Sequence, residues 1–236
     1  MIGTDPDRDG APDVDLDRVW TAVAAQVWRR TPGPIERLAR WVLRSPGLAR
    51  ALVTTPSLVL GWIVATAVVL AGGILATRET GAPFVAFVAP GVAACGIAYA
   101  YGPGIDDAWE LSCSMPVSDR MVLLVRALAV FGLNTVLGLL ASMASGVAVV
   151  LTFGWLVPMT AVCAVALSAA TLARSASVGA AAGVAGWIIT VLAGQASAGR
   201  LTAAVTDSML TLPYLAVAAG GAVVVLYATR ISREAS

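Results

Sequence analysis

The sequence contains neither histidine nor lysine, and all 15 of its basic residues are arginine. Without histidine there is no His-based metal site and no Ser–His or Cys–His catalysis. Without lysine there is no Walker A loop, because the lysine of that motif binds the terminal phosphates of ATP. The three cysteines have no metal-type spacing and predict no disulfide framework. We therefore expect no catalytic, cofactor-binding or metal site in this chain, and predict that it is not an enzyme.

The chain also has little charge. Only 12% of its 236 residues are charged, 58% are apolar, and the mean hydropathy is +0.85. Such values exclude an ordinary soluble domain and predict an all-α polytopic membrane protein. Because a helix needs about 20 apolar residues to cross a bilayer core, the hydrophobic runs predict six transmembrane helices. These cover residues 57–76, 82–101, 122–151, 157–173, 178–193 and 213–228. The predicted divisions are a cytoplasmic, partly disordered segment (1–33), an interfacial helix with its lead-in (34–56), the six-span region (57–228) and a cytoplasmic tail (229–236).

The placement of arginine predicts how the six spans are oriented. The N-terminal region, the second and fourth loops and the tail together hold 13 arginines, whereas the other three loops hold 2. Both termini, and the loop between the second and third spans, are therefore predicted to be cytoplasmic. Exclusive use of arginine, together with abundant alanine, valine, glycine and leucine, indicates a GC-rich bacterial genome. The predicted location is the bacterial plasma membrane.

An arginine-faced helix is predicted just before the first span. From Pro34 the apolar side chains follow the i, i+3, i+4 spacing of a helix, while Arg37, Arg40 and Arg44 share the opposite face. Together with Trp41, this pattern predicts an amphipathic helix that lies in the headgroup plane. The alternative is a solvated helix of a small cytoplasmic domain.

The loop from Gly102 to Arg126 is the most polar stretch between predicted spans. Its four acidic residues are Asp106, Asp107, Glu110 and Asp119. Asp107 followed three positions later by Glu110 is a capping-box pattern, which predicts a short helix. Pro116 then breaks the chain, and Asp119 suits the positive end of the next helix dipole. The loop is therefore predicted to carry one short cytoplasmic helix, a proline break and the start of the third span.

Few residues inside the predicted spans stand out. Gly179 and Gly183 have GxxxG spacing, with Gly186 further on, and permit close helix packing within the chain or with a second chain. Asn134 is the one strongly polar side chain well inside the third span, and we expect it to hydrogen-bond a neighbouring helix or to line a substrate path. The last loop, 194–212, is long enough for two short helices that dip into the membrane, or for a simple surface loop.

Together these features resemble the ABC type-2 exporter permeases, the membrane subunits of bacterial ATP-binding-cassette transporters. The shared pattern is six spans with cytoplasmic ends, an amphipathic helix before the first span, and an acidic helix followed by proline between the second and third. The local match is WELSCSMPVSDR, from Trp109 to Arg120, followed by the aliphatic run MVLLVR. The sequence departs from the family pattern at 112–114, where leucine is usual, and at Asp119, where a second basic residue is common.

The resemblance implies a permease subunit that works with a separate ATPase subunit, which would bind ATP and Mg²⁺, and with a second membrane subunit, identical or different. It implies that a coupling helix contacts the ATPase, with the contact residues Asp106, Asp107, Trp109, Glu110, Leu111, Pro116 and Arg120. The arginines of the interfacial helix would belong to an elbow-like helix. Membrane lipid is a further expected partner and nucleic acid is not. A bundle without buried charge would suit an amphipathic or lipid-like substrate.

Two other classes of function stay open. One is a non-transporting membrane anchor or regulator, whose arginine helix and acidic N-terminal tail recruit a cytoplasmic factor. The other is an intramembrane enzyme, which is the weakest because no pair of ionisable groups inside the spans provides an acid and a base.

Overall fold

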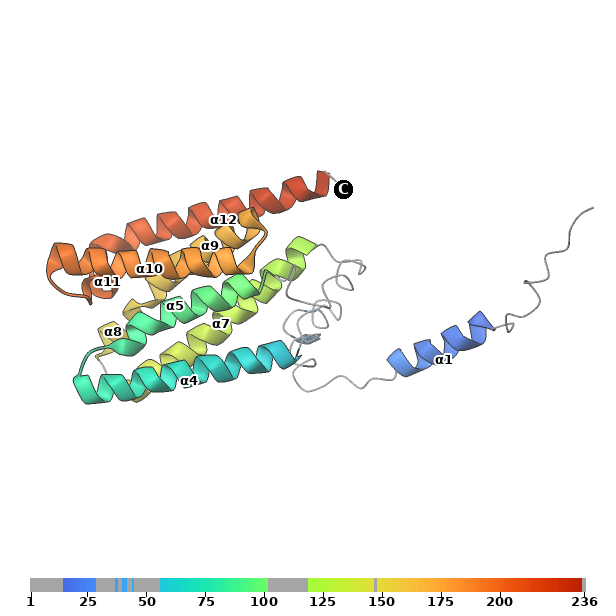
Figure 1. Cartoon of the computed structure of the whole chain (residues 1–236), viewed down its shortest axis with the longest axis horizontal. Coiled ribbons are helices and arrows are strands. Elements are labelled where there is room, and N and C mark those ends of the chain that lie inside the picture. The colour runs from blue at the N-terminus through green and yellow to red at the C-terminus, as the bar shows by residue number, and fades with distance from the viewer. Residues whose placement is uncertain are drawn as a thin grey trace, which may run out of the picture.

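The computed structural model describes residues 15–28, 37, 40–41, 44, 56–101, 119–146 and 148–234. Every regular element within these ranges is a helix. The elements are α1 (Leu16–Trp28), α4 (Pro56–Thr80), α5 (Phe84–Tyr99), α7 (Asp119–Ser145), α8 (Val149–Gly154), α9 (Leu156–Ala173), α10 (Ala176–Ala198), α11 (Ala203–Thr206), the 3₁₀ turn η2 (Ser208–Leu210) and α12 (Thr211–Glu234). Helices α4, α5, α7, α9, α10 and α12 lie side by side in one bundle, each running opposite to the one before it, and α1 lies apart (Figure 1).

Five stretches of the described chain are helical, long and apolar enough to cross a membrane, as expected of a multi-pass membrane protein. They cover Gly61–Thr80, Met121–Ser145, Leu151–Ala173, Ala176–Ala198 and Ser208–Thr229. The predicted span 82–101 corresponds to α5, which has only 16 residues. At 1.5 Å per residue α5 is about 24 Å long, less than a hydrocarbon core of about 30 Å. In place of six full-length spans, the structure has five long helices and this shorter one.

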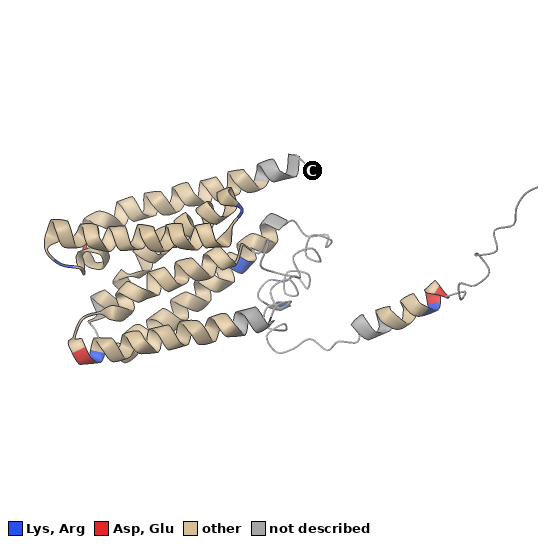
Figure 2. Ribbon diagram, viewed as in Figure 1, with Lys and Arg blue, Asp and Glu red and all other residues tan. Residues whose placement is uncertain are grey.

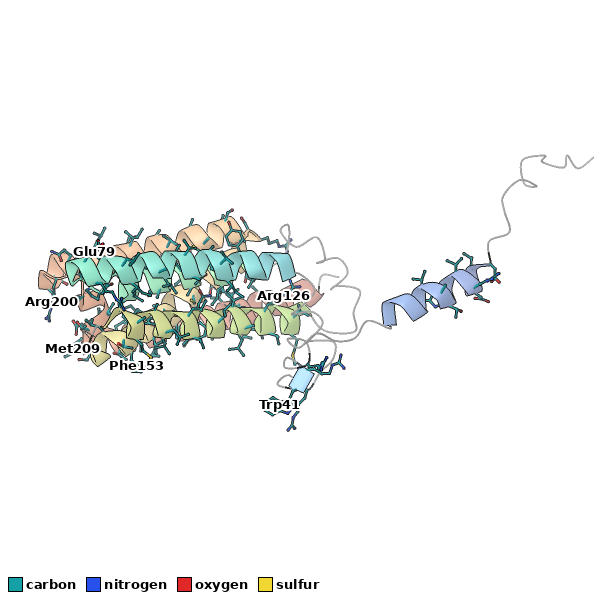
Figure 3. The ribbon with its side chains drawn as sticks, turned by 90° about the horizontal axis from the view of Figure 1, so that it is seen from below. Trp41, Glu79, Arg126, Phe153, Arg200 and Met209 are labelled. Atoms are coloured by element: carbon teal, nitrogen blue, oxygen red, sulfur yellow. The ribbon has the colours of Figure 1, made fainter. Side chains whose placement is uncertain are left out.

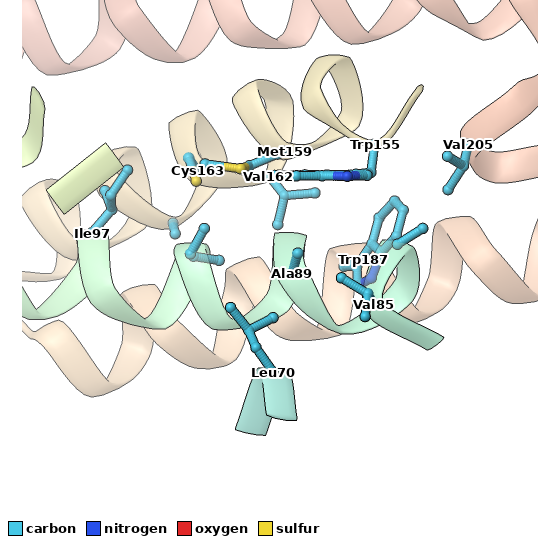
Figure 4. Close-up of a cluster of buried hydrophobic side chains, with 14 of the residues drawn as sticks. Leu70, Val85, Ala89, Ile97, Trp155, Met159, Val162, Cys163, Trp187 and Val205 are labelled. Carbon is cyan, nitrogen blue, oxygen red and sulfur yellow. The ribbon is translucent and has the colours of Figure 1, made fainter. Parts of the chain in front are cut away.

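Helix α5 is short because turns limit it at both ends, and it is central because its side chains are small. Pro83 precedes it, and Ala100 and Tyr101 form a turn after it. Helices α4, α7, α9 and α10 all pack against it. Alanines such as Ala93 and Ala94, both 0% exposed, allow these helices to approach closely. Figure 4 shows side chains from α4, α9, α10 and α11 gathered around α5 as one hydrophobic core.

The predicted third span, 122–151, is interrupted in the structure. Helix α7 ends at Ser145, Gly146 has a φ of +74°, and α8 begins at Val149. A residue in the left-handed region ends a helix, and glycine adopts that region without steric cost. The apolar run therefore forms two helices separated by a turn.

Trp155 fixes the junction of α8 and α9 against α7. Its side chain is 0% exposed, and its Nε1 donates a hydrogen bond to Ser142 Oγ at 3.1 Å. Its ring occupies the space beside Gly138, where an added Cβ would lie 2.5 Å from the ring atom Cη2. The junction of α8 and α9 is thus held on α7 by one large side chain, one hydroxyl and one glycine.

The predicted loop 194–212 is mostly helical. Helix α10 extends into this range and ends at Gly199, which has a φ of +67°. Helix α11 follows with Ala203 and Ala204 buried, and it packs against α10 and α8. The Tyr214 hydroxyl donates to the carbonyl oxygen of Ala204 at 2.8 Å. The segment is therefore folded onto the end of the bundle, closer to the short-helix alternative than to a simple surface loop.

Candidate functional site

The predicted coupling residues belong to the connection between α5 and α7. Asp106, Asp107, Trp109, Glu110, Leu111 and Pro116 lie outside the described residues. Arg120 lies in the first turn of α7. The start of α4, the end of α5, the start of α7 and the end of α12 all lie at one end of the bundle (Figure 1).

The predicted interfacial helix is described at four positions. Arg37, Arg40 and Trp41 are helical, and Arg44 has a left-handed φ of +49°. The Trp41 side chain is 78% exposed and lies outside the bundle (Figure 3). An exposed tryptophan beside arginines is the composition expected of a helix in the headgroup region.

Charged residues within the described part of the bundle lie toward its two ends, and the residues between them are uncharged (Figure 2). At the end where α4 begins, the charged side chains that the structure describes are those of Arg126 and Arg174, and both are basic. At the opposite end two basic and two acidic side chains balance one another: Arg78, Glu79, Arg200 and Asp207. The described side chains therefore give one end a positive charge and leave the other neutral.

Tyr101 and Arg174 both belong to the positive end. Tyr101 follows α5, and Arg174 lies between α9 and α10 with a φ of +51°. Burial raises the pKa of the Tyr101 phenol, and the Arg174 guanidinium lowers it in part. The end of α5 and the start of α10 lie at the same end of the bundle (Figure 1). A guanidinium therefore lies where α5 ends and α10 begins.

Two polar side chains are buried between the helices without a full set of hydrogen bonds. Asn134 on α7 is 4% exposed; its Nδ2 donates to the Val130 carbonyl oxygen at 2.8 Å, and its Oδ1 has no partner. Thr66 on α4 is 2% exposed, and its Oγ1 has no partner. Because α4 and α7 run parallel and Arg78 donates to the Ala144 carbonyl, 66 positions further on, Thr66 and Asn134 lie at about the same height.

A groove of about 450 Å³ lies between α4, α5 and α10. Trp62 is at one end of it, where its ring packs so closely on Gly96 that an added Cβ would lie 2.6 Å from the ring atom Cζ2. Trp187 is at the other end and donates through Nε1 to the Phe87 carbonyl oxygen at 2.6 Å. The remaining lining side chains are small or aliphatic apart from the Phe87 ring and the Thr66 hydroxyl. The groove can therefore accept an apolar group and offers it almost no hydrogen bonds.

The glycines of the predicted GxxxG pattern do not share one environment. A Cβ at Gly179 would lie 2.5 Å from the Ala170 Cβ, and one at Gly183 would lie 2.8 Å from the Ala166 Cβ, so both glycines pack against α9. A Cβ at Gly186 would have no neighbour within 4 Å. Close packing within the chain thus uses the first two glycines and leaves the third facing open space.

No known protein family, curated protein or solved structure matches this chain. Within the ranges that the structure describes, no three His, Cys, Asp or Glu side chains come together to hold a metal ion.

Thr66, Trp62 and the groove were not singled out from the sequence. Threonine inside an apolar helix usually bonds the carbonyl oxygen of its own helix four residues back, as Thr77 does to Gly73, so its presence carries little signal. The tryptophan pair, Trp62 and Trp187, is a stronger signal, because a large amphipathic ring in an alanine-rich span marks a place where helices separate or a surface begins.

Proposed function

We propose that this chain is the permease subunit of an ATP-driven exporter, and that it moves an amphipathic or lipid-like substrate across the bacterial plasma membrane. ATP and Mg²⁺ belong to a separate ATPase subunit, and a second membrane subunit completes the working unit. One observation carries the proposal: the two segments that are predicted to contact an ATPase subunit join the bundle at the same end. The segment that carries Arg37, Arg40 and Arg44 precedes α4, which begins at this end. The Gly102–Ser118 connection follows the end of α5 and precedes the start of α7, which lie at the same end (Figure 1).

The charge distribution supports a cytoplasmic location for that end. Of the described side chains, Arg126 and Arg174 are at this end, whereas the charges at the opposite end balance. Loops rich in arginine stay on the cytoplasmic side of a membrane. Both termini are cytoplasmic in this proposal, and the predicted coupling residues face the compartment that contains ATP.

The unpartnered polar atoms of Thr66, beside the groove between α4, α5 and α10, and of Asn134, on α7, support movement of α4 and α7 within the bundle. A buried polar atom without a partner costs about 1–3 kcal/mol, so a bundle with a purely structural role would gain by replacing it. This cost is offset if the two atoms find partners in a second arrangement of the helices, or on a substrate that passes through the bundle.

The test is ATP hydrolysis by the purified complex of the full chain with its ATPase subunit. Trp109→Ala and Glu110→Gln are expected to lower substrate-stimulated hydrolysis while the complex still assembles. Glu79→Gln, a carboxylate replacement at the opposite end of the bundle, is the matched control and should leave it unchanged. Unchanged stimulation in both loop variants, with normal assembly, would remove this loop from the mechanism.

A second candidate is a membrane anchor that recruits a cytoplasmic factor, and α1 favours it. Leu16 and Trp20 are each 74% exposed, and with Val19 and Val23 they form an apolar stripe at helical spacing. Such a stripe can dock on another protein. Purification of the tagged full chain from its native membrane separates the two candidates. An associated ATPase subunit supports the permease, and a signalling factor without an ATPase supports the anchor.

A further inference from the structure

The groove between α4, α5 and α10 has the length and position of one membrane leaflet. On α5 its lining runs from Phe87 to Cys95, a rise of eight residues or about 12 Å at 1.5 Å per residue. Half of a hydrocarbon core is about 15 Å. On α4 the lining runs from Trp62 to Val69, and the apolar stretch of that helix is Gly61–Thr80. The groove therefore occupies the half of the bundle next to the start of α4 and stops near the middle.

A positive charge lies beyond the end of the groove. Cys95 is the last α5 residue in the lining, and Tyr101 is six residues further, about 9 Å along the axis. Arg174 lies at this same end, between α9 and α10, and α10, which also lines the groove, begins two residues after it. The polar headgroup layer adds about 5–7 Å on each side of the hydrocarbon core. A guanidinium at this height is placed to meet a lipid phosphate.

We propose that this groove binds one acyl chain of an anionic glycerophospholipid, whose phosphate lies against Arg174. The apolar lining matches a hydrocarbon chain, the length matches one leaflet, and the charge at its end matches the headgroup. Gly91 forms the floor of the groove, where an added Cβ would meet only the Trp187 Cδ1 at 3.8 Å. The site does not depend on whether the chain is a permease.

The site is tested on the full chain in detergent with phosphatidylglycerol as the probe, and native mass spectrometry counts the phospholipids bound per chain. Gly91→Leu puts a side chain into the groove, and Gly132→Leu is its matched control, because Gly132 on α7 faces open space. We expect one retained phosphatidylglycerol in the wild type and in Gly132→Leu, and none in Gly91→Leu. Val69→Trp, at a position 45% exposed on the rim, should also expel the lipid without altering the core.

Arg174→Asn tests the headgroup, since asparagine also accepts the left-handed backbone of this position. This variant should retain a phospholipid but lose a preference of about fivefold for phosphatidylglycerol over phosphatidylcholine. With brominated acyl chains, tryptophan fluorescence should be quenched in the wild type and less so in Gly91→Leu, because Trp62 and Trp187 line the groove.

Two results would overturn the proposal. The first is equal retention of lipid by Gly91→Leu, Val69→Trp and the control. The second is a change from dimer to monomer in Gly91→Leu and Val69→Trp with no change in bound lipid, which would show that a second copy of the chain covers the groove.

Discussion

Replacing Gly179 by alanine measures how closely α9 and α10 are packed. The new Cβ would lie 2.5 Å from the Ala170 Cβ and 2.6 Å from the Ala166 carbonyl oxygen, and neither atom belongs to a flexible side chain. To restore ordinary carbon contacts of about 3.5 Å, α10 must move away from α9 by about 1 Å. That displacement also loosens the contact that Gly183 makes with Ala166. Overpacking of this kind costs about 1–3 kcal/mol.

Gly186→Ala is the matched control, because it lies in the same helix and its Cβ would have no neighbour within 4 Å. Both substitutions gain about 1 kcal/mol of helix propensity, so this gain cancels when the two variants are compared. We expect Gly179→Ala to unfold in SDS titration with a free energy about 1–3 kcal/mol lower than that of Gly186→Ala. Equal free energies of unfolding would contradict the close approach of α10 to α9.

Three further substitutions test individual contacts by their effect on the free energy of unfolding in detergent. Trp155→Phe removes the donor to Ser142 Oγ and part of a fully buried ring, and should lower the free energy of unfolding by about 2–3 kcal/mol. A smaller loss than that caused by Ser142→Ala would contradict the hydrogen bond between these two side chains. Arg78→Met removes the hydrogen bond to the Ala144 carbonyl oxygen at 2.7 Å and should lower it by about 0.5–1 kcal/mol, and no loss would show that water replaces this contact. Thr66→Val replaces an unpartnered buried hydroxyl by a methyl group and should raise it by about 1 kcal/mol, whereas a loss would reveal a partner for the hydroxyl.

Hydropathy predicted the helical bundle well, because each long apolar run has to be helical to satisfy its backbone in a bilayer. The first predicted span, 57–76, falls within α4, and the fourth, 157–173, falls within α9. Hydropathy did not predict the break at Gly146, since glycine is apolar and only its positive φ ends α7. Hydropathy also did not predict that α5 is short, because Tyr101 counts as apolar whether it lies in a helix or in a turn.

Asn134 was found from the sequence because its amide is rare within a span, and the structure shows it buried with one unpartnered oxygen. Thr66 could not be found in this way, since only the packing of α4 shows that its hydroxyl does not bond its own helix. The different surroundings of Gly179 and Gly186 also depend on how α10 is rotated, which the spacing of the glycines does not specify. Composition identifies candidates, and helix rotation decides which of them contact a neighbour.

Helix α4 is held less tightly than α9 and α10. It borders the large groove on the side of α10 and a second groove of about 250 Å³ on the side of α7, and it carries the unpartnered Trp62 Nε1 and Thr66 Oγ1. In contrast, α9 is joined closely to α10 at Gly179 and Gly183 and to α12 at Gly221, where an added Cβ would lie 2.9 Å from the Ala164 Cβ on α9. Moving α4 therefore disrupts fewer close contacts than moving α9 or α10. In the proposed permease, α4 directly follows the segment that carries Arg37, Arg40 and Arg44, so a force applied to that segment by the ATPase subunit would displace α4 first and leave α9 and α10 as a fixed support.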